Sequence, residues 1–212
     1  MPESSAKRSA REREVAITRS IGAPRELVFE AWTDAQRLAE WRPRGFTNPV
    51  CELDARPGGA LRIHMLGLDG TLYPNRGVVR ELLRPERFVF TCILEGRNGE
   101  ALVETLNTVT FEQEDGGTKL TLRAQVVYAA AEAAPMLDGM DEGWSQTLDR
   151  LAGEAEVRAL IDARIQAVRA KDTDAAMAHH PGGRSAIRRG QPVAIHRRRR
   201  REETRAGMVR FF

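Results

Sequence analysis

The stretch Leu137–Ala152, LDGMDEGWSQTLDRLA, decides the fold. Apolar residues recur in it at every third or fourth position, which places them on one face of a helix. They are Leu137, Met140, Trp144, Leu148 and Leu151. Asp138 is positioned to cap the start of this helix, and Gly153 is expected to end it. Because strand-like sequence precedes it, we expect the helix to lie across the face of a sheet.

The chain before this helix alternates between apolar and polar residues in short runs, a pattern typical of strands. The predicted strands are residues 13–21, 50–55, 60–67, 78–83, 87–94, 102–113 and 119–127. Asp69-Gly70 and Asp115-Gly116 are hairpin signals between neighbouring strands. Two short helices are predicted at residues 25–33 and 35–41, where Pro24 suits a first helical turn and Asp34 a cap.

These elements predict an α+β domain over residues 12–153. Its curved, mainly antiparallel sheet of about seven strands wraps around a long C-terminal helix, and two short helices follow the first strand. A domain of about 150 residues buries enough surface to fold without disulfides or a structural metal.

Charge is distributed unevenly along the chain. It has 33 Lys and Arg residues against 30 Asp and Glu residues, but residues 1–153 carry more acidic than basic residues and residues 154–212 the reverse. The pI near 9.2 is therefore a property of the C-terminal part. The tail has no aromatic residues interleaved with its arginines, so we do not expect nucleic acid as a partner.

The parts outside the domain have their own patterns. Residues 1–11 are small and polar and are expected to be disordered. Residues 154–180 predict a second amphipathic helix, whose apolar positions are Val157, Leu160, Ile161, Ile165 and Val168. Residues 181–212 are rich in arginine and poor in apolar residues, which predicts a basic disordered tail.

The two cysteines, Cys51 and Cys92, show neither metal-type spacing nor a disulfide framework. We interpret them as reduced thiols. The N-terminal residues lack the apolar segment of a secretory signal, and no run is apolar enough to span a bilayer. We therefore expect a cytoplasmic protein without membrane insertion.

Three stretches resemble one known superfamily. They are VFEAWTDAQRLAEW at 28–41, CELDARPGGALRIHMLGLDG at 51–70 continued by NRGVVRELLRPERFVFT at 75–91, and GMDEGWSQTLDRLA at 139–152. In this order they make residues 13–152 similar to the SRPBCC (START-like, helix-grip) superfamily, and within it to the bacterial branch that resembles the activator of heat-shock-protein ATPase (Aha).

The resemblance implies a hydrophobic cavity between the sheet and the closing helix, which would hold an apolar or amphipathic small molecule. It does not imply one reaction, because relatives include binders, cyclases, lyase-like enzymes and chaperone co-factors. Trp41-Arg42-Pro43 departs from the paired tryptophans of many relatives. We expect the added charge at the rim to alter ligand choice.

Residues 154–180 resemble the opening helix of a SnoaL-like (nuclear-transport-factor-like) module. No strand pattern follows this helix, although such modules continue into a curved sheet. We therefore hypothesise that residues 181–212 are translated out of frame. Sequencing beyond the stop codon tests this, since the idea requires an open frame that encodes strands.

His64, Glu81 and Glu104 are the candidate catalytic residues. A histidine titrates near neutral pH, and a carboxylate in an apolar cavity has a raised pKa, so either could move protons. Glu81 and Glu104 are the strand carboxylates expected to point inward. The alternative for all three is an ordinary position in a strand, partly buried or facing solvent. The sequence contains no HExxH, CxxC or GxSxG motif and predicts no metal and no cofactor.

Large apolar residues on the predicted elements are the candidates for lining the cavity. They are Trp32, Trp41, Phe46, Ile63, Met65, Phe90, Met140, Trp144 and Leu148. The same residues would serve equally as plain core. The sequence thus predicts a binder of a hydrophobic small molecule. The alternatives are a cyclase- or isomerase-like enzyme that uses the cavity carboxylates or the histidine, and a chaperone co-factor or protein-interaction module.

Overall fold

Seven strands form one antiparallel sheet in the order β1-β7-β6-β5-β4-β3-β2 in the computed structural model, which describes residues 13–172. The strands are β1 (Glu14–Ile21), β2 (Phe46–Leu53), β3 (Ala60–Gly67), β4 (Leu72–Leu83), β5 (Arg87–Glu95), β6 (Ala101–Glu114) and β7 (Gly117–Ala129). The helices are α2 (Arg25–Thr33), α3 (Ala35–Leu38), the 3-10 turn η1 (Ala131–Ala133), α4 (Ala134–Asp138) and α5 (Met140–Arg169).

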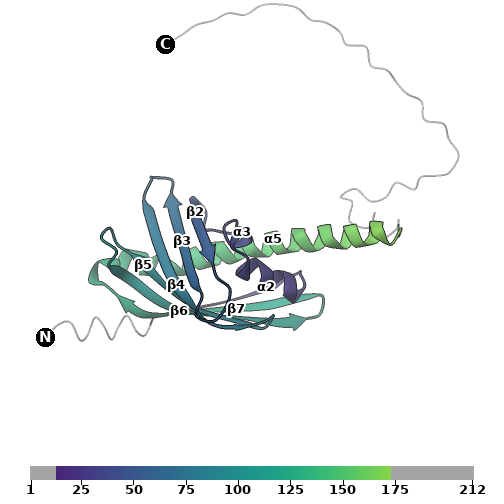
Figure 1. Ribbon diagram of the computed structural model, residues 1–212, viewed down its shortest axis with the longest axis horizontal. Coiled ribbons are helices and arrows are strands. Elements are labelled where there is room, and N and C mark those ends of the chain that lie inside the picture. The colour runs from purple at the N-terminus through teal and green to yellow at the C-terminus, as the bar shows by residue number, and fades with distance from the viewer. Residues whose placement is uncertain (1–12, 173–212) are drawn as a thin grey trace, which may run out of the picture.

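The sheet curls, and α2, α3 and α5 lie on its inner side (Figure 1). Strands β2 to β7 follow one another as hairpins, while β1 pairs with β7 at the far edge. The helix-grip architecture predicted from the sequence is confirmed. Residues 1–11, the tail 181–212 and the predicted helix beyond residue 172 lie outside the described residues.

Strands β2 and β4 begin earlier than predicted. Each contains a proline near its start, and a proline in the sequence usually indicates a break in a strand. Pro49 lies at the register shift between Thr47 and Val50, on the edge strand β2, where a missing N–H is tolerated. Pro74 lies in the part of β4 that pairs with β3, before the pairing with β5 starts at Asn75. Both prolines thus occupy positions that need no inter-strand donor on one side.

The two hairpin signals and the cap predicted at Asp34 are confirmed. Gly70 and Gly116 adopt positive φ angles of 81° and 77°, which glycine tolerates without strain. The Asp34 carboxylate accepts hydrogen bonds from the backbone N–H groups of Gln36 and Arg37, as a helix cap does. Helix α3 is shorter than predicted and ends at Leu38.

The closing helix differs from the prediction at both ends. Leu137 and Asp138 belong to the separate helix α4, and Gly139 occupies the N-cap position of α5 without a side-chain cap. Asp138 instead pairs with Arg13 at 3.1 Å. Gly153 does not end the helix, which continues without a break to Arg169. Gly153 lacks the positive φ of a helix-terminating glycine, and an interior glycine costs only about 1 kcal/mol.

The main core lies between the inner face of the sheet and the helices. Its largest fully buried side chains are Trp32, Phe29, Phe88, Phe111, Ile21, Leu120, Leu122, Leu148 and Leu151. A smaller cluster joins the ends of β6 and β7 to α4, with Leu102, Val103, Val126, Ala133 and Leu137. A binding site is therefore expected in the interior that α5 covers.

Candidate functional site

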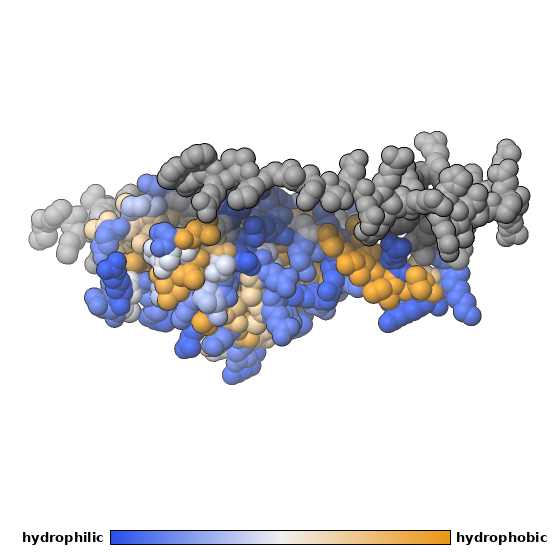
Figure 2. All heavy atoms as spheres, turned by 90° about the horizontal axis from the view of Figure 1, so that it is seen from above, coloured by the Kyte–Doolittle hydropathy of each residue, from blue (hydrophilic) through white to orange (hydrophobic). Residues whose placement is uncertain are grey.

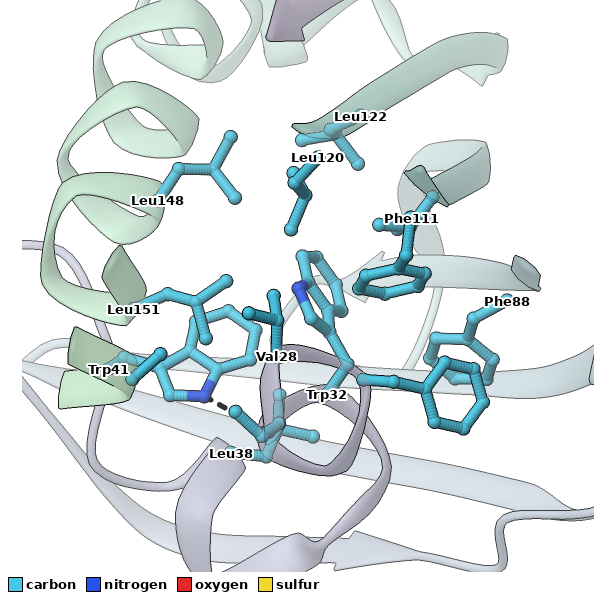
Figure 3. Close-up of a cluster of buried hydrophobic side chains, with 14 of the residues drawn as sticks. Val28, Trp32, Leu38, Trp41, Phe88, Phe111, Leu120, Leu122, Leu148 and Leu151 are labelled. Carbon is cyan, nitrogen blue, oxygen red and sulfur yellow. Dashed lines mark hydrogen bonds between the residues drawn. The ribbon is translucent and has the colours of Figure 1, made fainter. Parts of the chain in front are cut away.

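The strand register determines which side chains face the interior. Phe90 on β5 lies opposite Asn107 on β6 and Val79 on β4, and these residues share the face of the sheet that packs under the helices. Figure 3 shows this region: α5 brings Leu148 and Leu151 toward the aromatic side chains of α2 and the sheet.

Trp32 on α2 is the centre of the interior. Its side chain is 1% exposed. Its ring centroid lies 4.7 Å from that of Trp41, 6.2 Å from that of Phe90 and 6.2 Å from that of Trp144, which stacks on it from α5. Three different parts of the chain thus meet at one tryptophan.

The structure brings six of the nine predicted lining residues together. Trp32, Trp41, Phe90 and Leu148 are core members, and Ile63 and Trp144 pack against them. The other three lie elsewhere. Phe46 contacts the ring of Tyr73 at 5.8 Å, Met65 pairs with Tyr73 in the β3–β4 ladder, and Met140 packs on the smaller cluster.

The three catalytic candidates do not share this interior. His64 alternates with the inward-facing Ile63, and Glu104 alternates with the inward-facing Thr105, so both lie on the outer face. Glu81 pairs with Val89 on the outer face and lies 3.7 Å from Arg87. The inward orientation expected for the two carboxylates is therefore not supported. For Glu81 the reason is a bulge between Val79 and Glu81, which reverses the strand's alternation.

Polar side chains form a row across the inner face of β4, β5 and β6. The Asn107 amide Nδ2 donates to the Thr105 hydroxyl at 2.9 Å and to the Phe90 carbonyl at 3.5 Å. Thr105 donates to the Cys92 carbonyl at 3.4 Å, and the Cys92 thiol to Asn75 Oδ1 at 3.6 Å. None of these four side chains is among the predicted lining or catalytic residues.

Four buried polar side-chain atoms have no hydrogen-bond partner among the described residues: Arg25 Nε, Trp32 Nε1, Asn48 Oδ1 and Asn107 Oδ1. Asn107 belongs to the polar row, and Trp32 packs against Phe90, which lies opposite Asn107 in the sheet. Asn107 is 0% exposed. The Phe90 carbonyl can only accept, so it favours the orientation in which the Asn107 amide nitrogen faces it. The interior thus offers an unused acceptor and an unused donor, and the Trp32 nitrogen lies on the side of its ring turned toward α5 (Figure 3).

The two cysteines are poor candidates for nucleophilic chemistry. Both thiols are free. Burial raises the pKa of Cys51 to about 11 and that of Cys92 to about 12, because a thiolate loses its hydration in the interior. Since the thiolate is the reactive form, both side chains stay protonated and unreactive near neutral pH.

A seam between β1 and α5 borders the interior. An open depression of about 430 Å³ lies there, lined by Ala16, Ile17, Thr18, Arg19, Asp141, Glu142 and Ser145. The Arg19 guanidinium donates to Asp149 at 2.9 Å and to Ser145 at 2.7 Å, which ties β1 to α5 at the edge of the depression. Among the described residues, no group of His, Cys, Asp or Glu is arranged to hold a metal ion.

The fold and sequence match a known family. Residues 22–156 match the family model of the "Activator of Hsp90 ATPase homolog 1-like protein". The chain belongs to this family. The match covers α2, the whole of the sheet except β1, and the part of α5 that packs on the domain. The resemblance inferred from the sequence is thus confirmed at the level of the family.

Solved structures that match this chain along most of their own length agree with this family assignment. A protein from Chromobacterium violaceum is 29% identical, with a TM-score of 0.58 over 68% of this chain and 98% of its own. A protein from Mycobacterium smegmatis is 29% identical, with a TM-score of 0.57 over 66% of this chain and 88% of its own. An AHSA1 protein from Silicibacter pomeroyi shares the fold at 22% identity, with a TM-score of 0.59 over 69% of this chain and 99% of its own.

No curated protein matches the chain. Within residues 13–172, no helix has both the length and the apolar character needed to cross a membrane.

Proposed function

We propose that this protein binds a neutral small molecule, largely apolar, between the inner face of the sheet and α5. The observation that carries the proposal is the pair of buried polar atoms without partners, Asn107 Oδ1 and Trp32 Nε1. A buried polar group left without a hydrogen bond costs about 1–3 kcal/mol. A ligand with a hydroxyl or amide group could satisfy both atoms, since such a group donates and accepts hydrogen bonds.

The chemistry of the interior indicates the class of ligand. The buried polar residues among those described are Thr91, Thr105, Asn107, Thr118 and Thr147, and none of them is charged. An ionised ligand group would lose its hydration there without an opposite charge to compensate. A hydroxyl or amide suits the site better, since it can donate to Asn107 Oδ1 and accept from the Trp32 N–H. The aromatic rings around Trp32 would hold the apolar part.

The seam between β1 and α5 is the proposed entrance. The surface depression lies at this seam, and Arg19 crosses the seam with its bonds to Asp149 and Ser145. Such exposed ion pairs are weak, worth about 0–1 kcal/mol, so they can open and close with ligand passage. We place the protein in the cytoplasm, where its two free thiols would stay reduced.

Native mass spectrometry of the purified full chain tests the proposal. We expect a fraction of the protein to carry a small neutral mass that is released on denaturation, because the interior is closed and exchange is slow. Titration with the neutral fluorophore N-phenylnaphthylamine is expected to quench Trp32 and Trp144, which stack with their centroids 6.2 Å apart. Absence of both a bound mass and saturable quenching would contradict the proposal.

A second candidate function is an interaction with Hsp90, which the family description and one surface feature favour. Leu68, at the tip of the β3–β4 hairpin, is 92% exposed, and Leu72 beside it is also exposed. Exposed leucines at a hairpin tip suit a protein contact. If this function holds, adding the protein to purified bacterial Hsp90 raises its ATPase rate, and Leu68→Ser reduces the effect. An unchanged ATPase rate with the wild-type protein rules this function out.

A further inference from the structure

Helix α5 carries two apolar stripes on different faces. The first, with Trp144, Leu148, Leu151 and Ala155, packs on the domain. The second begins at Val157, which follows Leu148 by about two and a half helical turns and therefore points the opposite way. The second stripe thus faces away from the domain to which the helix belongs.

The second stripe is exposed along its whole length. Its residues are Val157, Leu160, Ile161, Ile165 and Val168, with exposed fractions of 57%, 48%, 49%, 42% and 61%. Ala159 is the last residue of α5 that packs against the core. Beyond it the helix extends past the sheet (Figure 1), and apolar side chains gather on this part of the surface (Figure 2). A continuous apolar stripe of this kind marks an interaction surface.

The charges beside the stripe change sign along the helix. Glu154, Glu156 and Asp162 outnumber Arg158 in its first half, and Arg164, Arg169 and Lys171 outnumber Asp172 in its second half. One copy of the stripe therefore complements a second copy only when the two helices run in opposite directions. A parallel arrangement would place Glu154 beside the partner's Glu154 and Arg169 beside the partner's Arg169, and like charges at an interface disfavour that pairing.

We propose that this stripe, from Val157 to Val168, is the interface of a homodimer in which two copies of α5 pair antiparallel. When Val157 lies opposite the partner's Val168, Leu160 comes level with the partner's Ile165. The same register brings Glu154 level with the partner's Lys171 and Ile161 level with the partner's Arg164, whereas Glu156 accepts a hydrogen bond from the Gly22 N–H of its own domain at 3.0 Å. Arg164 lies within the stripe, where its aliphatic stem covers apolar surface while its charge reaches the rim.

The interface is small, since it consists of one helix face from each copy. We therefore expect a reversible dimer, with a dissociation constant on the order of micromolar. The apolar stripe provides the affinity, and the exposed charges set the direction of pairing. The dimer leaves the interior of each domain untouched, so this inference does not depend on the proposed ligand.

Sedimentation velocity of the full chain over about two decades of concentration tests the dimer. The wild-type protein is expected to shift toward twice the chain mass of 23.7 kDa. Ile165→Glu places a charge in the stripe, level with the partner's Leu160, and is expected to raise the dissociation constant at least about tenfold. Gln166→Glu adds the same charge on the other face of the helix and is expected to leave association unchanged. Circular dichroism confirms that each variant is folded.

A charge exchange tests the orientation. Glu154→Lys alone is expected to weaken the dimer, and Glu154→Lys combined with Lys171→Glu, the residue level with it on the partner, is expected to restore it. A wild-type protein that stays monomeric at every concentration overturns the proposal, including the case in which residues 173–212 of the same chain cover the stripe. A dimer that Ile165→Glu does not weaken lies at another surface, and failure of the double exchange to restore binding overturns the antiparallel arrangement.

Discussion

Trp32→Ala is expected to lower the free energy of unfolding by about 3–5 kcal/mol, the range for removing a large buried aromatic side chain. Trp32 joins α2 to Trp41, to Phe90 on β5 and to Trp144 on α5, so its removal leaves a cavity that no single neighbour can fill. Since small domains are stable by only about 5–15 kcal/mol, this change takes a large share of the total. Urea unfolding followed by far-UV circular dichroism measures the change.

Two variants serve as controls for Trp32→Ala. Trp32→Phe keeps an aromatic ring and removes the unpaired Nε1 donor, so we expect a clearly smaller loss of stability. Trp144→Ala truncates the stacked but only half-buried partner and is expected to fall between the two. If Trp32→Ala costs less than about 1 kcal/mol, the interior is not organised around this residue, and the binding site placed there loses its structural basis.

Much of the architecture could be predicted from local sequence signals. The alternation of apolar residues in Arg87–Leu94 gives β5, and Asp34 gives the cap of α3. The period of Trp144, Leu148 and Leu151 gives the face of α5 that packs on the sheet. These predictions are confirmed because each pattern depends only on residues that lie within a few positions of one another in the sequence.

The errors arose where distant pairing overrides local pattern. The bulge at Glu81 turns its carboxylate outward, and a bulge depends on the partner strand rather than on the sequence of the strand itself. Gly153 was predicted to end the helix, but Leu151 and Ala155 pack on the core from either side of it and hold the helix straight through. The end of a helix is therefore decided by tertiary contacts as much as by its own residues.

Asn107 could have been found from the sequence, although it was missed. It shares the alternation of Val109 and Phe111, which both face the core, so an amide stands at an inward position of an otherwise apolar face. An uncharged polar residue at an inward position of an otherwise apolar strand face is a better indication of a site than a charged residue at an outward position. Glu104 is a residue of the second kind. The absence of a partner for its oxygen could not be inferred from the sequence, because it depends on the packing of α5 and α2.

Asn107→Leu is expected to weaken the binding of a neutral ligand by at least about tenfold, the effect of losing one good hydrogen bond in a dry site. It is also expected to leave the unliganded protein at least as stable as the wild type, or more stable by about 1 kcal/mol. Leucine has the same branching and number of heavy side-chain atoms as asparagine, and it removes the buried oxygen that has no partner. The loss of the amide donors to Thr105 and Phe90 offsets part of this gain.

Thr105→Val is the matched control on the same face. The Thr105 hydroxyl has a partner in each role, since it accepts from Asn107 and donates to the Cys92 carbonyl. Its removal is therefore expected to lower the free energy of unfolding by about 1 kcal/mol. The two variants should thus change stability in opposite directions, although each removes polar atoms from the same row. Titration with N-phenylnaphthylamine and urea unfolding of the ligand-free protein measure the two quantities separately.

This opposition distinguishes a binding residue from a structural one. If Asn107 served only to hold β5 and β6 together, Asn107→Leu would lower the free energy of unfolding by about 1–3 kcal/mol and leave ligand binding unchanged. If a buried water already satisfied Asn107 Oδ1, the variant would lose stability without any bound mass in the wild-type protein. A rise in stability together with a loss of binding is the result that only a ligand site explains, because proteins retain an unsatisfied buried group where function requires it.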